Sequence, residues 1–393
     1  MNKALLHTQV QEFIHENLNT DVNSLAFKTS PFPEISMAEI ITQLRAKQKA
    51  KQKLPHWYTT ENIMYPEKIS LEQTSSEATA SYKASLIEGD SLVDLTGGFG
   101  VDCFYFAKKF KKIIHLEKNK SLSVIAQWNF TQLETANVEC LNADAISFLK
   151  EADRIFDWIY ADPSRRNIQQ NKVFLLSDCT PDIPKHLNEI WKYTHNLLIK
   201  TSPLIDLKLG IQQLRNVKEI HIVAVKNEVK ELNWVLQKGY TGAVKINCID
   251  LKSDYLQPFV FQYDDEKKVQ IDCKEPLTYL YEPNAAILKS GAFKTVAHNY
   301  KVFKLATHSH LYTSNEIISF PGRSFQIMEV LPFQKKQLRK RFSKTKANIT
   351  TRNFPWTVAR IRKELQIKDG GELFLFFTTS LNNKHLVIIC KKT

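Results

Sequence analysis

Short apolar strands alternate with helical segments between residues 91 and 251, and this alternation limits the possible folds more than any other feature. The sequence predicts strands at 91–95, 112–116, 138–142, 155–161, 196–201, 217–225 and 245–251. Helices are predicted at 103–109, at 121–135 and from residue 145 onward. Such alternation is typical of a parallel sheet covered by helices. We therefore expect a doubly wound α/β domain in this part of the chain.

Polar side chains follow the ends of four successive predicted strands. The first strand ends in Asp94 and turns through the glycine-rich segment 96–100, and the next three are followed by Glu117, Asp144 and Asp162. Parallel sheets bind ligands at the carboxyl ends of their strands, and glycines let the backbone approach a ligand closely. Glu117 has the spacing of a carboxylate that binds ribose hydroxyls. The full dinucleotide-binding pattern is absent, because its third glycine is replaced by a cysteine at position 103, which argues against a bound pyrophosphate.

This ordered series resembles motifs I to IV of the class I S-adenosyl-L-methionine-dependent methyltransferases, over roughly residues 70–250. The resemblance implies S-adenosyl-L-methionine as the cofactor and a Rossmann-like sheet. Gly98 and Gly100 would pass under the methionine end, and Glu117 would bind the ribose hydroxyls. Asp144 would bind the adenine amino group, and Asp94 would support the loop and the cofactor's amino group. The complete set of implied cofactor-binding residues is Asp94, Thr96, Gly98, Gly100, Glu117 and Asp144.

Further segments resemble a bacterial group that joins this methyltransferase domain to a ferredoxin-like module and a C-terminal THUMP-like domain. The segments are 72–80, 281–284 and the basic C-terminus. The fold class that we expect is α/β, a class I methyltransferase sheet with an N-terminal helical region and C-terminal α+β modules. The expected domains are a helical region at 1–70, the methyltransferase domain at 71–253, a ferredoxin-like module at 254–322 and a THUMP-like domain at 323–393.

The positive charge of the chain is concentrated near its C-terminus. The net charge is +13, and residues 331–393 contain 15 Lys or Arg against three acids, a net +12, which leaves +1 for the other 330 residues. A small, strongly basic module is typical of a protein that contacts a phosphate backbone. The alternative is a solvated basic face that only favours solubility. The predicted RNA-binding side chains of this module are Lys335, Arg339, Arg341 and Arg352.

The segment after the fourth strand bears on the methyl acceptor. Amino-methyltransferases usually have Asn or Asp, two prolines and an aromatic residue here, whereas this chain has Asp162-Pro163-Ser164, without the second proline and the aromatic ring. Arg165 can stack on a base through its guanidinium plane or hold a phosphate together with Arg166. An ion pair with nearby acids is the alternative for these two arginines.

Carbon methylation of a pyrimidine needs a cysteine nucleophile. The comparable segment here, 200–203, contains no cysteine. We therefore expect transfer to a purine nitrogen, with Asp162, Pro163 and Ser164 as the catalytic residues.

The expected function is an S-adenosyl-L-methionine-dependent RNA methyltransferase acting on rRNA or tRNA. The alternatives are a DNA amino-methyltransferase and a non-catalytic RNA-binding protein with a relic methyltransferase fold. Six cysteines without a CxxC pair and the absence of a long apolar run favour a cytoplasmic protein without membrane or metal partners. The sequence does not determine the oligomeric state.

Overall fold

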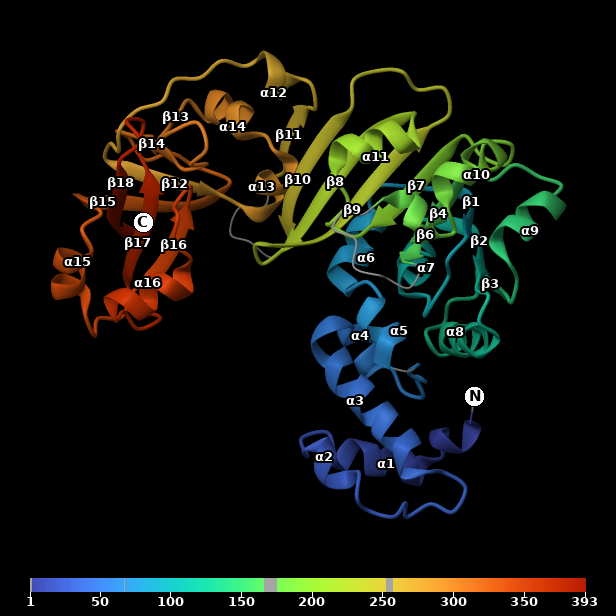
Figure 1. Ribbon diagram of the computed structural model, residues 1–393. Coiled ribbons are helices and arrows are strands. Elements are labelled where there is room, and N and C mark those ends of the chain that lie inside the picture. The colour runs from blue at the N-terminus through green and yellow to red at the C-terminus, as the bar shows by residue number, and fades with distance from the viewer. Residues whose placement is uncertain (1, 67, 166–174, 252–256) are drawn as a thin grey trace. The chain divides into compact units, whose positions relative to one another are not determined.

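The structure is a computed structural model that describes residues 2–66, 68–165, 175–251 and 257–393. The chain divides into two compact units (Figure 1). The first comprises residues 1–218 and 232–241, and the second comprises residues 219–231 and 242–393. Each unit is described by itself.

The N-terminal part of the first unit is helical, as the sequence predicts. Its helices are η1 (Lys3–Leu6), α1 (Thr8–Glu16), α2 (Val22–Leu25), α3 (Met37–Lys53), α4 (Pro55–Thr59), α5 (Lys68–Gln73) and α6 (Glu77–Ala84). A capping box begins α3: the hydroxyl of Ser36 accepts from the backbone N–H of Glu39, and the carboxylate of Glu39 accepts from the backbone N–H of Ser36. Leu5, Val10 and Ile14 are buried in a small core of their own.

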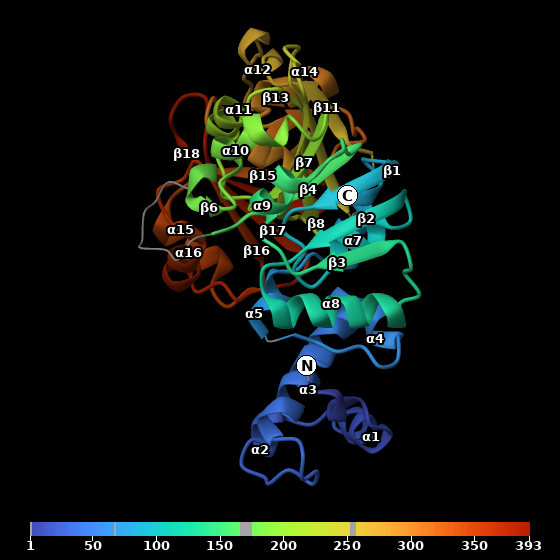
Figure 2. The same cartoon turned by 90° about the vertical axis from the view of Figure 1, so that its right-hand side faces the viewer.

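A buried amide joins these helices to the sheet domain. Asn129, on α8 (Lys120–Gln132), is fully buried, accepts from the backbone N–H of Met64 at 2.9 Å and donates to its carbonyl at 2.8 Å. The indole of Trp128 donates to the carbonyl of Asn62 at 2.9 Å. Figure 2 shows α8 between the strands and the N-terminal helices. The segment that leads from α4 to α5 is therefore held on α8 by its backbone.

The sheet of the first unit has the strand order β9-β7-β4-β1-β2-β3. Its strands are β1 (Gly89–Asp94), β2 (Phe110–Leu116), β3 (Val138–Leu141), β4 (Trp158–Ala161), β7 (Asn196–Thr201) and β9 (Glu228–Gln237). All neighbours pair in parallel except β7 and β9, which are antiparallel. The other elements are α7 (Val101–Phe106), α9 (Ala145–Glu151), β5 (Ser164–Arg165), η2 (Leu176–Asp178), β6 (Cys179–Thr180), α10 (Ile183–Ile190) and α11 (Leu207–Leu214). The Rossmann-like sheet is confirmed, but the sequence prediction missed β9.

The second unit begins with three strands in the order β11-β10-β8 and continues with a seven-stranded sheet in the order β13-β14-β12-β15-β18-β17-β16. The first three are β8 (Val217–Val225), β10 (Lys245–Leu251) and β11 (Phe259–Gln262). The seven are β12 (Tyr279–Pro283), β13 (Phe303–Lys304), β14 (Tyr312–Ser314), β15 (Gly322–Pro332), β16 (Asn348–Arg352), β17 (Leu373–Thr379) and β18 (His385–Lys392). The helices are α12 (Asp265–Lys268), α13 (Ala285–Ser290), α14 (Phe293–Tyr300), α15 (Lys335–Phe342) and α16 (Val358–Leu365).

The C-terminal strands are buried on both faces. Phe377 of β17 packs with Leu338 of α15 and Ile361 of α16, whereas its neighbour Phe376 packs on the opposite side with Phe325 of β15. Successive side chains of a strand point to opposite faces, so β17 serves two cores. Figure 1 shows α15 and α16 next to β16 and β17. The chain continues through β15, α15, β16 and α16 to a final hairpin of β17 and β18, and Asn383 in the hairpin turn has φ +57°.

Candidate active site

The glycine loop joins β1 to α7 in a backbone conformation that requires glycine. Gly98 and Gly100 have φ of +58° and +86°, in the left-handed region that disfavours other residues. A Cβ on Gly100 would also lie 2.6 Å from the ring of Phe130, so the loop packs tightly on that side. Among the described residues, only the carbonyl oxygen of Thr96 lies within 4 Å of a Cβ placed on Gly98, at 3.6 Å, so this part of the chain leaves space beside the glycine.

Asp94 holds the start of the loop. It is almost completely buried, and its Oδ1 accepts from the backbone N–H and the hydroxyl of Thr96 at 2.8 and 3.1 Å. The thiol of Cys103 donates to Oδ2 at 3.1 Å. Burial raises the pKa of Asp94 to about 7, although these hydrogen bonds act in the opposite direction. The structure thus assigns Asp94 a loop-supporting contact.

Glu117 follows β2 and reaches the same loop. Its Oε2 accepts from the backbone N–H of Gly98 at 2.9 Å, and its Oε1 accepts from the backbone N–H of Asn119 at 2.6 Å. The side chain is half-buried. A carboxylate is therefore fixed at the end of β2, directly beside the glycine loop, as the sequence predicts.

Asp144 has a different local setting. It caps α9 by accepting from the backbone N–H and hydroxyl of Ser147 at 3.1 and 3.2 Å, and Lys118 lies 3.7 Å from its Oδ2. The hydrogen bonds from Ser147 hold the pKa of Asp144 below its ordinary value. The side chain is about half exposed, and within the described residues its partners, Ser147 and Lys118, lie outside the glycine loop. Its predicted role toward an adenine ring stays a prediction.

Asp162 lies at the end of β4, where two neighbouring strands hold it. Its backbone N–H donates to the hydroxyl of Thr96 at 2.6 Å, which ties the ends of β1 and β4 together. Lys200 of β7 donates to its Oδ2 at 2.6 Å, and the two side chains are 14% and 29% exposed. In the described part of the chain its Oδ1 has no hydrogen-bond partner. Burial raises the pKa of Asp162, and Lys200 acts against this rise.

A second carboxylate lies close enough to influence Asp162. Asp102 of α7 pairs with the fully buried Lys83 of α6, whose Nζ lies 3.2 Å from its Oδ1. Its Oδ2 accepts from the hydroxyls of Tyr160 at 2.8 Å and of Ser75 at 3.0 Å. Burial alone would raise the pKa of Asp102, but Lys83, then Lys200, and the two hydroxyls hold it below its ordinary value.

We call Lys83, Asp102, Asp162 and Lys200 the charge cluster. Reasoning from the sequence missed it, although signals were present. Asp102 ends the glycine-rich segment, and Lys200 interrupts the apolar run of β7. A charged residue inside such a run is unusual, because burying a charge is costly unless it is paired.

The residues after Asp162 are described only in part. Pro163 is buried and Ser164 is exposed, and β5 pairs antiparallel with β6 through Ser164 and Thr180. Arg166 lies outside the described residues, and of Arg165 only the backbone, in β5, is described. The predicted catalytic roles of Pro163 and Ser164 and the predicted substrate contacts of Arg165 and Arg166 therefore stay predictions.

Three of the four predicted RNA-binding side chains in the C-terminal module form ion pairs. Lys335 lies 2.6 Å from Glu364, and Arg341 bonds Glu329 at 2.9 Å. Arg339 is exposed and has no acidic partner in the residues that the structure describes.

Arg352 contacts the buried carboxylate of Glu282 at 2.7 Å. Glu282 also accepts from Nε of Arg323 at 2.9 Å. The Glu in the 281–284 segment is therefore a structural anion that joins β12 to β15 and β16.

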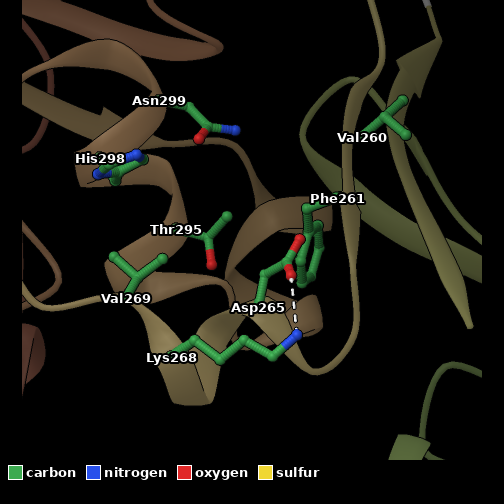
Figure 3. A pocket seen from close by; sticks show the side chains of 8 residues that line it. All are labelled: Val260, Phe261, Asp265, Lys268, Val269, Thr295, His298 and Asn299. Carbon is green, nitrogen blue, oxygen red and sulfur yellow. Dashed lines mark ion pairs between the residues drawn. The ribbon is translucent and has the colours of Figure 1, made fainter. Parts of the chain in front are cut away.

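A cavity of about 280 Å³ lies elsewhere, in the second unit, between β11, α12 and α14 (Figure 3). Asp265 and Lys268 form a 3.8 Å ion pair in its wall. Its buried hydroxyl, on Thr295, is already bonded to Glu266 at 2.9 Å. Three of its polar side chains, those of Asp265, Lys268 and Thr295, thus already have partners within the protein.

Two absences concern only the described part of the chain. It contains no group of three or more His, Cys, Asp or Glu side chains placed to hold a metal ion. None of its helices combines the length and apolar character needed to cross a membrane.

Comparison with known proteins links the chain to methyltransferases. A ferredoxin-like domain family matches residues 279–321, and a THUMP domain-like family matches residues 322–392. The crystal structure of a candidate methyltransferase from Porphyromonas gingivalis W83 is 34% identical, covers 100% of this chain and 99% of that chain, and superposes with a TM-score of 0.89.

An uncharacterised RNA methyltransferase from Mycoplasma mobile is 27% identical over 92 residues. This match covers 23% of the chain, and the chain spans only a quarter of the length of that relative. Because the match to the Porphyromonas gingivalis protein extends over the full length of both chains, the protein belongs to the same family, the class I methyltransferases with a ferredoxin-like domain and a C-terminal THUMP-like domain.

Proposed function

We propose that the protein is an S-adenosyl-L-methionine-dependent RNA methyltransferase that transfers a methyl group to a purine nitrogen in rRNA or tRNA. The observation that carries the proposal is the position of Asp162. It lies at the carboxyl end of β4, bonded through Thr96 to the glycine loop that begins at Asp94. An acceptor group and a ligand-binding loop are thus adjacent on one sheet edge, where such sheets bind ligands.

The residues of the loop suit the proposed cofactor. The space beside Gly98 allows a ligand to approach the backbone, and Glu117 presents a half-buried carboxylate next to it. A carboxylate in this position accepts hydrogen bonds from ribose hydroxyls. Asp94 supports the start of the loop through the backbone N–H and hydroxyl of Thr96, so the backbone beside the proposed cofactor is held in place.

When bound, the cofactor supplies an electrophilic methyl group. The protein's part is to present the acceptor nitrogen. Oδ1 of Asp162 is available to accept one N–H of a purine amino group, which turns the nitrogen lone pair away from the carboxylate. The carboxylate also provides a site for the proton that the nitrogen loses on methylation.

RNA as the substrate is supported by the second unit. Its C-terminal 63 residues contain almost all of the net positive charge, and residues 322–392 match the THUMP domain-like family. Exposed cations of this kind bind phosphate backbones and give a salt-dependent affinity. The name of the Mycoplasma mobile relative agrees with an RNA substrate.

The decisive experiment is methyl transfer from tritiated S-adenosyl-L-methionine to RNA from a strain that lacks the gene. Nucleoside mass spectrometry then identifies the product. We expect label in a single methylated purine, and none in RNA from the parent strain, which is already modified. Label in DNA alone would favour the DNA amino-methyltransferase. Absence of cofactor binding in calorimetry would favour a relic fold.

A further inference from the structure

We infer that Lys200 is a positioning residue that keeps Asp162 ionised and leaves a single carboxylate oxygen for the acceptor. The inference deepens the proposed function and rests on it for the identity of the acceptor. It stands on the contact between Nζ of Lys200 and Oδ2 of Asp162, at 2.6 Å, in a largely buried setting.

The contact is set by strand pairing. β4 and β7 are parallel neighbours, and Ala161 pairs with Ile199 in their register. The next residue on each strand is Asp162 and Lys200, so the two charged side chains leave the sheet at the same level. The side chain of Lys200 is only 14% exposed and belongs to a largely buried strand, unlike a mobile lysine on the surface. The pair is thus built into the register of the sheet.

The surroundings explain why a cation is needed. Asp162 is partly buried, with a side chain that is 29% exposed, and Asp102 is a second carboxylate near enough to disfavour its ionisation. Lys200 on β7 and Lys83 on α6 oppose this effect, and Lys83 is itself held by Asp102 and Ser75. Asp94 lies on the other side, linked through the hydroxyl of Thr96. Lys83 and Lys200 therefore balance Asp102 and Asp162, and Nζ of Lys200 contacts the carboxylate of Asp162 directly.

The pairing has a chemical consequence for the acceptor. An ionised carboxylate only accepts hydrogen bonds, whereas a protonated one carries an O–H that competes with the N–H of an amino group. Lys200 holds Oδ2, so among the described residues Oδ1 is the oxygen without a partner, and it is the one that we expect a substrate N–H to meet. A carboxylate held in one orientation restricts the direction of the substrate N–H more than a freely rotating carboxylate does.

The test compares Lys200→Met, which removes the ammonium, with Lys200→Arg, which retains a cation. The first readout is the pKa of Asp162 by 13C NMR of protein labelled at aspartate carboxyl carbons, with the signal assigned by its loss in Asp162→Asn. We expect the pKa of Asp162 to rise by at least about one unit in Lys200→Met and to change little in Lys200→Arg.

The second readout is the pH profile of kcat. If the pKa of Asp162 rises by one unit, the acid limb of the profile shifts by one unit to higher pH. At a pH well below the pKa, kcat therefore falls about tenfold, and it recovers at alkaline pH. KM for S-adenosyl-L-methionine should stay within about twofold, since Lys200 is not part of the glycine loop. Lys200→Arg should restore the profile of the parent protein.

Two results would overturn the inference. One is an unchanged pKa of Asp162 in Lys200→Met. The other is a loss of kcat that is equal at every pH and is not rescued by Lys200→Arg. If Lys200→Met does not fold, Lys200→Gln replaces it. The NMR titration needs no turnover, so a parent protein that transfers no methyl group would refute the proposed function while the titration still decides the role of Lys200.

Discussion

The charge cluster of the first unit and the basic surface of the C-terminal module use the same kinds of side chain in opposite ways. Lys83 is fully buried and balanced by Asp102, whereas Arg339 and Lys340 on α15 are exposed. A buried cation acts on one neighbouring carboxylate at short range, because little water screens it. Exposed cations act together on a polyanion, and salt weakens them. Net charge alone therefore does not reveal which lysines matter for chemistry.

The second unit also contains a buried, paired charge, although most of its cations are exposed. Glu282 is 3% exposed and bonded to Arg323 and Arg352, so part of the basic charge of this unit serves its architecture. Arg352, which the sequence suggested for RNA binding, is thus already paired in the protein. The distinction is between paired, buried charges and exposed, unpaired ones, and it does not follow the boundary between the units.

The largest expected effect is the loss of stability in Lys83→Met. Removing one partner of a buried ion pair leaves the other charge uncompensated and costs about 3–5 kcal/mol. Urea unfolding measures this difference. The matched control is Lys111→Met, which breaks the exposed pair of Lys111 and Asp90 and should leave the unfolding midpoint unchanged. Equal midpoints for both variants would show that burial does not separate the two kinds of charge.

Next in size is the loss of methyl transfer in Asp162→Ala. Loss of the acceptor carboxylate should lower kcat by about 10²–10⁴-fold. Affinity for S-adenosyl-L-methionine, measured by calorimetry, should stay within about twofold, because the loop residues are intact. The exposed Asp153→Ala serves as the control and should retain full kcat. Full kcat in Asp162→Ala would place the acceptor site elsewhere.

A smaller effect concerns Asp94, a buried carboxylate that is bonded to Thr96 and Cys103 and has no cationic partner among the described residues. Its pKa is 3.8 in the unfolded reference and about 7 in the fold, so the folded state holds an extra proton between these values. The associated stability is complete below about pH 4 and is lost as the pH rises through 7. Calorimetry should show that Asp94→Asn raises Tm relative to the parent protein at pH 8 but not at pH 4. A gain of equal size at both pH values would contradict this assignment.

The smallest effect is expected on the basic surface. Reversal of Arg339 and Lys340 to Glu should weaken RNA binding about tenfold and lower the slope of log K against log salt by about two. Filter binding at several salt concentrations measures both quantities. The same reversal at Lys109 and Lys150, exposed residues of the first unit, is the control and should change the slope less. Equal slopes in both double variants would favour the solubility interpretation of the basic module.

The parts of the site that were predictable from the sequence follow from one rule. Asp94, Glu117 and Asp162 each follow a buried strand, and parallel strands bring their carboxyl ends to a common edge. The structure confirms that Thr96 bonds Asp162 and that Gly98 bonds Glu117. The sequence indicates the strand ends and the glycine turn, whereas the bond between Thr96 and Asp162 also requires β1 and β4 to be neighbours, which the structure shows.

The rest depends on contacts between distant segments. Lys200 meets Asp162 only because β7 lies beside β4 in a particular register, and Lys83 arrives from a helix that precedes the sheet. β9 was missed because its sequence mixes charged and apolar residues without strict alternation, and only its pairing with β7 makes it a strand. Arg352 and Glu282 are 70 positions apart in sequence, so no local sequence pattern predicts their ion pair.

The continuous seven-stranded sheet has a practical consequence for protein engineering. β12, from the ferredoxin-like region, hydrogen-bonds along its whole length to β15, from the THUMP-like region. A chimaera that transplants residues 322–392 alone would take a half-sheet with a bare edge and leave the counter-ion of Arg323 and Arg352 behind. A transferable segment should therefore begin before Tyr279, so that the ferredoxin-like and THUMP-like regions are transferred together.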